Sequence, residues 1–442
     1  MPHAEAALPP TETPSPVPTP ASAADAAPPP RTGLLRVLGL GLITGASDDD
    51  PSAIGTYAAV GARFGTSMLW AAPIMFPMMV TVVYLSSKLG QVAGKGLFEV
   101  IADRYPPIIL RLALIGVLIG NVFEAGADIG GMAAALGLLA PIPAAWILLP
   151  LTIGLVALQV WGSYALIRKV FQWLALALLA YVPAALLSRP DPMAILRGLV
   201  PTVEWSREFL SLFVAIIGTT LSAYLYTWQS NVEVEEEIER GRVHLWQRRG
   251  ASRQELAHSR RDIMSGMLFA NMVMFFVILS TAALHNAVKT DIETAADAAS
   301  ALRPFAGRAA ELLFATGIVA VGCLAVPVMT TGAAYDLCQT VGWEHGLYKK
   351  PHEAKRFYAV IAAFTAVATG LNLLGFNPMK ALVWAGIVQG FSTPPLLIMM
   401  MLLTNDHRVM QNRVNTPFLN VMGWTTTGIA LAATVALLVT SL

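Results

Sequence analysis

The sequence predicts an all-α polytopic membrane protein, and three observations support that prediction. Of the 442 residues, 55% are hydrophobic and 13% are charged, with a mean hydropathy of +0.61, which is too apolar for an ordinary soluble domain. The apolar residues gather in eleven runs, each able to cross a hydrocarbon layer of roughly 30 Å. The basic residues gather between alternate runs, as they do in loops on one side of a membrane.

The eleven expected helices follow one another with short connections, and we expect breaks in the first and the sixth. In chain order they cover residues 33–62, 67–92, 108–139, 143–162, 164–188, 208–240, 262–286, 309–341, 355–374, 379–404 and 417–441. With the N-terminus in the cytoplasm, 21 of the 29 Lys and Arg residues fall in cytoplasmic segments. This bias predicts an integral membrane protein, in a bacterial inner membrane, with a cytoplasmic N-terminus and an external C-terminus.

Residues 1–32 consist largely of Pro, Ala, Ser and Thr and contain few large apolar side chains. No basic segment leads into a short apolar core, so the pattern is not that of a cleaved signal peptide. We expect a disordered cytoplasmic tail.

Composition and motifs exclude several classes of function. The net charge is +1, and the basic residues sit in short loops, so we expect no nucleic-acid partner. The sequence has no HExxH, CxxC or GxSxG motif and no phosphate-binding loop, and its connecting segments are too short for a catalytic domain, so we expect neither an enzyme nor a cofactor. Cys323 and Cys338 lie fifteen residues apart on one expected helix, roughly 22 Å at the helical rise, and should be free thiols.

The middle of the first helix carries three consecutive carboxylates, Asp48, Asp49 and Asp50, followed by Pro51. Carboxylates at membrane depth are costly, and proline disfavours helix at the residue before it. We therefore expect the helix to break here. Unwound backbone within a membrane is tolerated where protein buries it or where it lines a watery cavity, so carboxylates and freed carbonyls at the break predict a site for a hard cation.

The sixth helix carries a patch of small and hydroxyl-bearing residues at its middle, which comprises Gly218, Thr219, Thr220, Ser222 and Ala223. Interrupted helices at matching positions of two halves point to a midplane binding site in an inverted-repeat transporter. The halves would be residues 33–188 and 208–404, with residues 417–442 as an additional eleventh helix. The alternative is that the patch serves only close helix packing.

These residues carry a resemblance to a known family. Asp50-Pro51-Ser52-Ala53, the segment GTTLSAYLYTWQ that begins at Gly218, and Thr404-Asn405-Asp406 resemble the NRAMP family of divalent-metal transporters, and more closely the NRAMP-related magnesium transporters. The resemblance implies a LeuT-type fold of two inverted five-helix repeats plus one helix. It also implies alternating access around a metal ion held between the breaks of helices 1 and 6.

The resemblance implies a ligand set, and this chain departs from it. The family aspartate is Asp50, but Ala53 stands at the position of the family asparagine and Ser222 at that of the methionine, with Thr219 and Tyr224 nearby. Loss of the soft sulfur ligand removes the basis for excluding harder ions. A wider site lined only by oxygen suits partly hydrated Mg²⁺ as the transported ion, with Mn²⁺ as a possible second substrate.

Proton coupling depends on carboxylates of the third helix. Glu124 and Asp128 lie four residues apart and share a helix face. The two proton-path carboxylates of the family align with Ala127 and Gly130, so we expect a uniporter that is not coupled to protons. Asp128 and Glu124 either line the aqueous path or have a purely structural role.

Other residues are weaker candidates. Gln389 is either a part of the permeation path or a hydrogen bond between packed helices. Of Asp48 and Asp49, we expect one to face the path and the other to accept amides or a hydroxyl. Five glutamates close the sixth helix, and we expect a solvated, salt-bridged helix end or, less favoured, a vestibule that attracts cations; they are Glu233, Glu235, Glu236, Glu237 and Glu239.

Three other functions are compatible with the sequence. One is a proton-coupled Mn²⁺ or Fe²⁺ transporter of the NRAMP type. Another is a carrier of the same fold for an organic solute such as an amino acid, which would not need three consecutive aspartates. The last is a membrane sensor that transports nothing. The expected partners are a divalent metal ion and the lipid bilayer, and the oligomeric state is left open.

Overall fold

The structure is a computed structural model, and it describes residues 40–441 except 141, 163–169, 171–172, 175–176, 205, 286–294 and 376–377. The expected N-terminal tail, residues 1–32, lies outside the described residues. Within the described part the chain is helical and contains no strand. This confirms the predicted all-α class.

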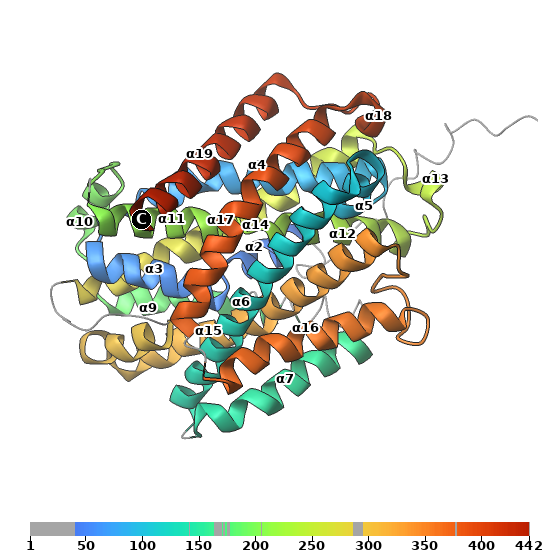
Figure 1. Cartoon of the computed structure of the whole chain (residues 1–442). Helices are drawn as coiled ribbons and strands as arrows, with labels where there is room; N and C mark the ends of the chain where they lie inside the picture. Colours follow the sequence, from blue (N-terminus) through green and yellow to red (C-terminus); the bar gives the residue numbers. More distant parts are fainter. Residues whose placement is uncertain are drawn as a thin grey trace, which may run out of the picture.

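The longer helices correspond to the expected spans, with several short helices between them (Figure 1). In chain order the helices are α2 (Leu40–Asp48), α3 (Pro51–Phe64), α4 (Ala71–Ala93), α5 (Leu97–Arg104), α6 (Pro107–Leu139), α7 (Ala144–Trp161), α9 (Tyr181–Leu187), α10 (Pro192–Gly198), α11 (Arg207–Thr220), α12 (Ala223–Glu239), α13 (Leu245–Arg248), α14 (Arg253–Thr281), α15 (Ala295–Val341), α16 (Lys355–Leu373), α17 (Pro378–Asn405), α18 (His407–Met410) and α19 (Pro417–Ser441). Short 3₁₀ turns cover Leu178–Ala180 and Ala282–Leu284.

Both expected breaks are present. The first helix is divided into α2, which ends at Asp48, and α3, which begins at Pro51. Proline is well suited to the first helical position because its missing amide hydrogen would have no partner there. The sixth helix is divided into α11 and α12, which are separated by Leu221 and Ser222.

One helix begins earlier than the hydropathy predicts, and another is preceded by an additional helical segment. α14 begins at Arg253 instead of residue 262, because Ser252 and Glu255 form a capping box that supports a polar first turn. α15 consists of two helical segments that meet at Gly307, whose φ of 81° is a conformation that favours glycine. The membrane-length part runs from Gly307 to Val341, close to the expected start at residue 309, and residues 295–306 form an additional segment before it. The expected span 164–188 falls partly outside the described residues.

Seven helical segments of the described chain are long and apolar enough to cross a membrane by length and composition. They are α4, α6, the α11–α12 pair, α14 with its 3₁₀ extension, α15 from Gly307 onward, α16, and α19 up to Ala436. Trp146 and Trp161, at the two ends of α7, each expose 78% of their surface. Exposed tryptophans at both ends of an apolar helix are typical of the two interfaces of a bilayer.

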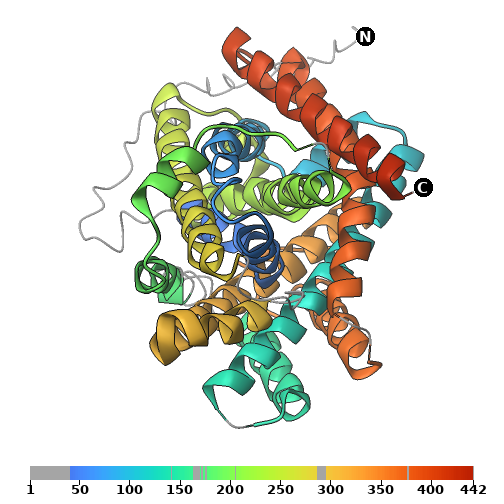
Figure 2. The same cartoon turned by 90° about the vertical axis from the view of Figure 1, so that its left-hand side faces the viewer.

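The broken helices lie inside the bundle, where the other helices surround them (Figure 2). Every residue of α2 is buried, and α2 packs chiefly against α14. The contact is tight because glycines face each other: a side chain on Gly266 would overlap the backbone of Gly41. α6 crosses the bundle and packs against α15, α16 and α17. This arrangement places the first break between α6 and α12.

Candidate metal site

Asp50 lies at the break of the first helix and caps α3. Its Oδ1 accepts a hydrogen bond of 2.7 Å from the backbone N–H of Ala53, and its side chain is nearly fully buried. An aspartate at this position satisfies one of the free amides of the helix start. Its second oxygen, Oδ2, faces the sixth helix.

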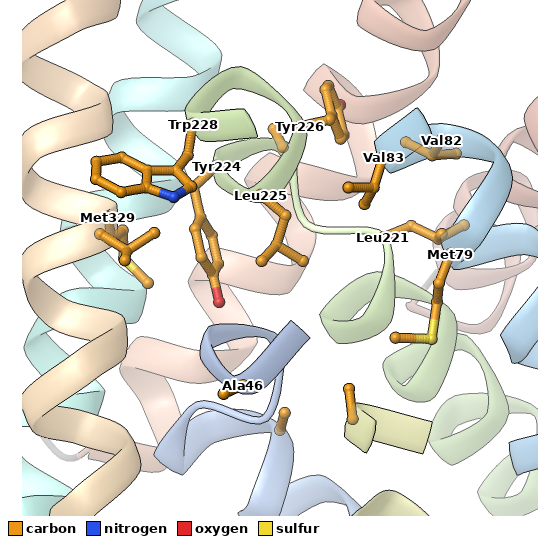
Figure 3. Close-up of a cluster of buried hydrophobic side chains, with 14 of the residues drawn as sticks. Ala46, Met79, Val82, Val83, Leu221, Tyr224, Leu225, Tyr226, Trp228 and Met329 are labelled. Atoms are coloured by element: carbon orange, nitrogen blue, oxygen red, sulfur yellow. The ribbon is translucent and has the colours of Figure 1, made fainter. Parts of the chain in front are cut away.

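Tyr224, in the first turn of α12, connects the two breaks. Its hydroxyl lies 3.2 Å from Asp50 Oδ2 and 2.6 Å from the carbonyl oxygen of Ser47. Figure 3 shows the Tyr224 ring extending from α12 toward the segment of Ala46, with Trp228 and Met329 beside it. Tyr224 therefore contacts the cation site that the sequence predicts, as well as packing against apolar side chains.

Two carboxylates of α6 reach the same break from the other side. Asp128 Oδ1 accepts hydrogen bonds from the Ser52 backbone N–H at 3.0 Å and from the Ser52 hydroxyl at 2.5 Å. Its Oδ2 has no hydrogen-bond partner among the described residues. Glu124 lies within hydrogen-bonding reach of Asp50. Asp128 thus holds Ser52 through one carboxylate oxygen. Its other oxygen makes no hydrogen bond to a described residue and could bind a cation.

The small residues of the site differ in where they point. The Ser222 hydroxyl lies 3.3 Å from Glu124 Oε1 and also close to the carbonyls of Gly218 and Thr219. The Thr219 side chain is half-buried, and its hydroxyl donates to carbonyls of its own helix. Ala53 is buried and contributes its backbone amide to Asp50. The Ser222 hydroxyl therefore reaches Glu124 as well as carbonyls of α11, whereas the Thr219 hydroxyl bonds only within α11.

Asp48 and Asp49 are fully buried, and none of their four carboxylate oxygens has a hydrogen-bond partner among the described residues. The expectation that one of the two accepts amides or a hydroxyl is therefore wrong within this part of the chain. The local reason is that Pro51 contributes no amide and the first free amides of α3 go to Asp50 and Asp128. Both side chains lie close enough to other carboxylates for mutual repulsion.

Five buried carboxylates surround the first break without converging on one point: Asp48, Asp49, Asp50, Glu124 and Asp128. No three His, Cys, Asp or Glu side chains in the described ranges are placed closely enough to enclose a metal ion. A cation entering this region would meet one or two carboxylates at a time and would keep other ligands, such as water. Gln389 lies in α17, but its side chain falls outside the described residues.

The acidic end of α12 differs from the expectation of a solvated helix end. Glu233, Glu235, Glu236 and Glu237 are buried, and Glu239 is exposed. The Glu233 carboxylate accepts hydrogen bonds from Ser87 at 2.6 Å, Gln229 at 2.9 Å and Ser259 at 3.0 Å, whereas Glu236 and Glu237 pair with arginines, as expected. The prediction of a solvated end is wrong for Glu233, which hydroxyls of α4 and α14 cover, and for Glu235, which Tyr335 and the connection between α15 and α16 cover.

Sequence reasoning missed the role of Ser52, which connects α3 to Asp128. It also did not single out Tyr57 and Tyr181, which are fully buried in the structure. A buried serine or tyrosine in an apolar helix gives no signal of its own, because its role depends on which distant carboxylate faces it.

Comparison with known proteins gives consistent results. A family model described as natural resistance-associated macrophage protein-like matches residues 41–440. The chain is 26% identical to the divalent metal cation transporter MntH of Deinococcus radiodurans over 399 residues, which cover 88% of this chain and 86% of the relative. It is 25% identical to the divalent metal cation transporter MntH of Bacillus subtilis over 416 residues, 92% of either chain.

Solved structures share the fold. A mutant of the Eremococcus coleocola manganese transporter superposes with a TM-score of 0.69 at 17% identity and covers 94% of this chain and 90% of its own. Mhp1, a nucleobase-cation-symport-1 family transporter, gives a TM-score of 0.53 at 15% identity, with 90% of this chain and 92% of its own covered. The overall fold of this chain is thus similar to that of a manganese transporter and, less closely, to that of a nucleobase-cation-symport-1 family transporter.

Proposed function

This chain belongs to the Nramp family, and from that membership we propose that it is an integral membrane transporter that imports a divalent metal cation by alternating access. The relatives that match most of its length are named divalent metal cation transporters. Each half of the chain supplies a broken helix, and the two breaks meet where the buried carboxylates gather.

One observation carries the proposal: Asp50 is held at the first break between Tyr224 of α12 and Glu124 of α6. Its capping bond to Ala53 fixes the carboxylate in place, so a cation can bind without reorganisation of the side chain. Carbonyls at the end of α2, such as that of Ser47, supply further oxygen ligands nearby.

For the transported ion we propose Mg²⁺ first and Mn²⁺ second. Ser222 provides a hydroxyl where NRAMP transporters of transition metals are expected to carry a methionine, so the site offers oxygen and lacks that sulfur. Mg²⁺ keeps several waters and binds through one or two carboxylates, which fits the spread of the acidic side chains around the break. Mn²⁺ accepts oxygen ligands as well, and the Eremococcus coleocola structure is that of a manganese transporter.

We further propose that transport is not coupled to protons, because Ala127 and Gly130 occupy the positions expected for the proton-path carboxylates. The inside-negative membrane potential would then favour entry of the cation. The second candidate function is a proton-coupled Mn²⁺ or Fe²⁺ transporter. It is favoured by the burial of Glu124 and Asp128 beside Asp50, since such carboxylates can carry protons.

The topology that accompanies this proposal has the N-terminus in the cytoplasm, the C-terminus outside, and the protein in a bacterial inner membrane. Residues 33–188 and 208–404 would form the two inverted repeats, and residues 417–442 the additional helix. The lipid-facing surface would include the exposed ends of α7.

The test is ion uptake into proteoliposomes that hold either a Mg²⁺ indicator or a pH indicator. The wild type should raise internal Mg²⁺ without internal acidification, and Asp50→Asn should abolish most of that uptake. The control is Asp103→Asn, because Asp103 is exposed on α5 and pairs with Lys95. Normal uptake by Asp50→Asn would refute the site, and acidification in step with Mg²⁺ entry would select the proton-coupled candidate. Inhibition by leucine or alanine would instead favour an organic-solute carrier.

A further inference from the structure

A second group of buried polar side chains lies between α12 and α15. Asp336 of α15 is fully buried, and neither of its carboxylate oxygens has a hydrogen-bond partner among the described residues. Gln339, three residues further along α15 and so next to it on the helix surface, is also buried, and its Oε1 likewise has no partner in this part of the chain. A buried carboxylate without a hydrogen bond is costly, so a cation or a proton must compensate its charge.

Contacts on either side of Asp336 show that its face of α15 is turned toward α12. The Nε2 of Gln339 donates a hydrogen bond of 2.7 Å to Oδ1 of Asn231. One turn before Asp336, a methyl group on Gly332 would lie 4.0 Å from the Cβ of Trp228. Residues 332, 336 and 339 share one face of a helix, so Asp336 lies between these two contacts. The Asp336 side chain therefore leaves α15 on the side of α12.

The facing side of α12 also bears oxygen atoms. Asn231 is buried and turns its Nδ2 to the carbonyl of Thr227 at 3.0 Å, so its Oδ1 faces α15. An amide oxygen has two lone pairs, and the bond from Gln339 uses only one of them. The Thr227 hydroxyl lies within reach of Asp336, although it donates to the carbonyl of Tyr224 at 3.2 Å.

This group lies beyond the Asp50 site, in the direction that the proposed topology assigns to the cytoplasm. Tyr224, whose hydroxyl contacts Asp50, is in the first turn of α12, and Asn231 follows on the same face seven residues later, roughly 10 Å along the helix. Figure 3 shows Tyr224 and Trp228 on this part of α12, with Met329 of α15 beside them. The seam between α12 and α15 therefore leads from the Asp50 site to Asp336.

The donors in this seam are one carboxylate and two amide oxygens, from Asp336, Gln339 and Asn231. Such oxygens are ligands for hard cations, and Mg²⁺ binds through one or two carboxylates while it keeps several waters. A site with a single carboxylate binds a divalent cation more weakly than a site with several. Weak binding suits a position on a path, because an ion must be able to leave it.

Building on the proposed function, we propose that Asp336, Gln339 and Asn231 form a second, weaker position for the transported divalent cation, between the Asp50 site and the cytoplasm. An ion released from Asp50 would move along the face of α12 and bind at Asp336 before it leaves the protein. The charge of Asp336 would lower the electrostatic barrier that the cation meets between two buried helices.

The first test counts the Mn²⁺ ions bound to the purified full-length protein by equilibrium dialysis, with Mn²⁺ alone as the probe. The wild type should bind one ion tightly and a second ion roughly tenfold or more weakly. Asp336→Asn keeps the shape of the side chain and should lose only the weaker ion, whereas Asp50→Asn should lose only the tighter one. Gln339→Glu, which adds a carboxylate, should strengthen the weaker binding roughly tenfold.

The second test measures Mg²⁺ uptake into proteoliposomes. Asp336→Asn should lower the maximal uptake rate roughly threefold to tenfold without raising the half-saturating Mg²⁺ concentration, because the Asp50 site is intact. The control in both tests is Glu311→Gln, since Glu311 is a buried carboxylate of the same helix that pairs with Arg303. This control should bind two Mn²⁺ ions and transport Mg²⁺ as the wild type does.

The outcomes separate the two proposals. One Mn²⁺ ion per wild-type protein, lost in Asp50→Asn and kept in Asp336→Asn, overturns the second position and leaves the proposed function intact. Two ions in Asp336→Asn, or unchanged uptake by that variant, also overturn it. So does an infrared carboxylic-acid band that persists in the wild type at saturating Mn²⁺ and is absent from Asp336→Asn, because Asp336 would then hold a proton. No bound Mn²⁺ in the wild type overturns both proposals.

Discussion

Ser52 and Asp128 are joined by two hydrogen bonds to one oxygen, because both the backbone N–H and the hydroxyl of Ser52 donate to Asp128 Oδ1, at 3.0 and 2.5 Å. The pair ties the start of α3 to α6 across 76 residues of sequence. It holds the break of the first helix against the carboxylate-bearing face of α6. The two donors are buried, so the bond pair has no competition from bulk water.

Replacement of Asp128 should therefore weaken the protein at the break. Asp128→Ala leaves two buried donors of Ser52 without their acceptor, which costs about 2–4 kcal/mol of unfolding free energy. Ser52→Ala removes only the hydroxyl and should cost about 1 kcal/mol. Thermal unfolding in detergent measures both, and equal effects of the two substitutions would contradict the assigned hydrogen bonds.

The charge and the capping role of Asp50 can be separated. Asp50→Asn keeps an oxygen that accepts the Ala53 amide, and asparagine is as good an N-cap as aspartate, so the unfolding temperature should stay close to that of the wild type. Asp50→Ala also loses the cap and should lose about 1 kcal/mol of stability. Both substitutions should lower Mg²⁺ uptake at least tenfold, because they remove the charge. An Asp50→Asn protein that unfolds as early as Asp50→Ala would show that the cap depends on the charge.

Selectivity should follow the side chains at Ala53 and Ser222. The double substitution Ala53→Asn with Ser222→Met introduces an amide oxygen and a soft thioether, which favour Mn²⁺ and Cd²⁺ over Mg²⁺. We expect the ratio of Cd²⁺ to Mg²⁺ uptake in proteoliposomes to rise at least tenfold. The single substitution Ala53→Asn serves as the control, since it adds oxygen without sulfur. An unchanged ratio in the double variant would refute the ligand argument.

The sequence is sufficient to predict both helix breaks because their causes are local. Pro51 and the preceding acidic residues end α2, and the small residues after Ile217 allow the turn between α11 and α12. The contacts within the site are different in kind. Tyr224 and Asp50 are 174 residues apart, so their pairing depends on how the helices pack. The burial of Glu233 likewise depends on Ser87 and Ser259, which a local charge pattern cannot reveal.

The close contact between α2 and α14 leads to a prediction for glycine. A methyl group on Gly266 would overlap the backbone of Gly41, so Gly266→Ala requires the helices to move apart and should cost about 1–3 kcal/mol. The matched control is Gly370→Ala on α16, where nothing lies within 4 Å of the added methyl group. Alanine favours a helix over glycine by roughly 1 kcal/mol, so that control should be neutral or stabilising. Thermal unfolding of both variants in the same detergent provides the comparison.

Glu235 fixes the segment that connects α15 to α16. Its carboxylate accepts hydrogen bonds from the backbone N–H groups of Leu347 at 2.9 Å and Tyr348 at 3.1 Å, and from the hydroxyl of Tyr335. Glu235→Ala leaves these three donors without their shared acceptor and should lower the free energy of local unfolding of this connection by about 2–4 kcal/mol. Because the connection then opens more often, limited proteolysis between residues 342 and 354 should become several times faster. Glu239→Ala, at an exposed position of the same helix, is the control, and equal cleavage rates in the two variants would contradict the anchoring role of Glu235.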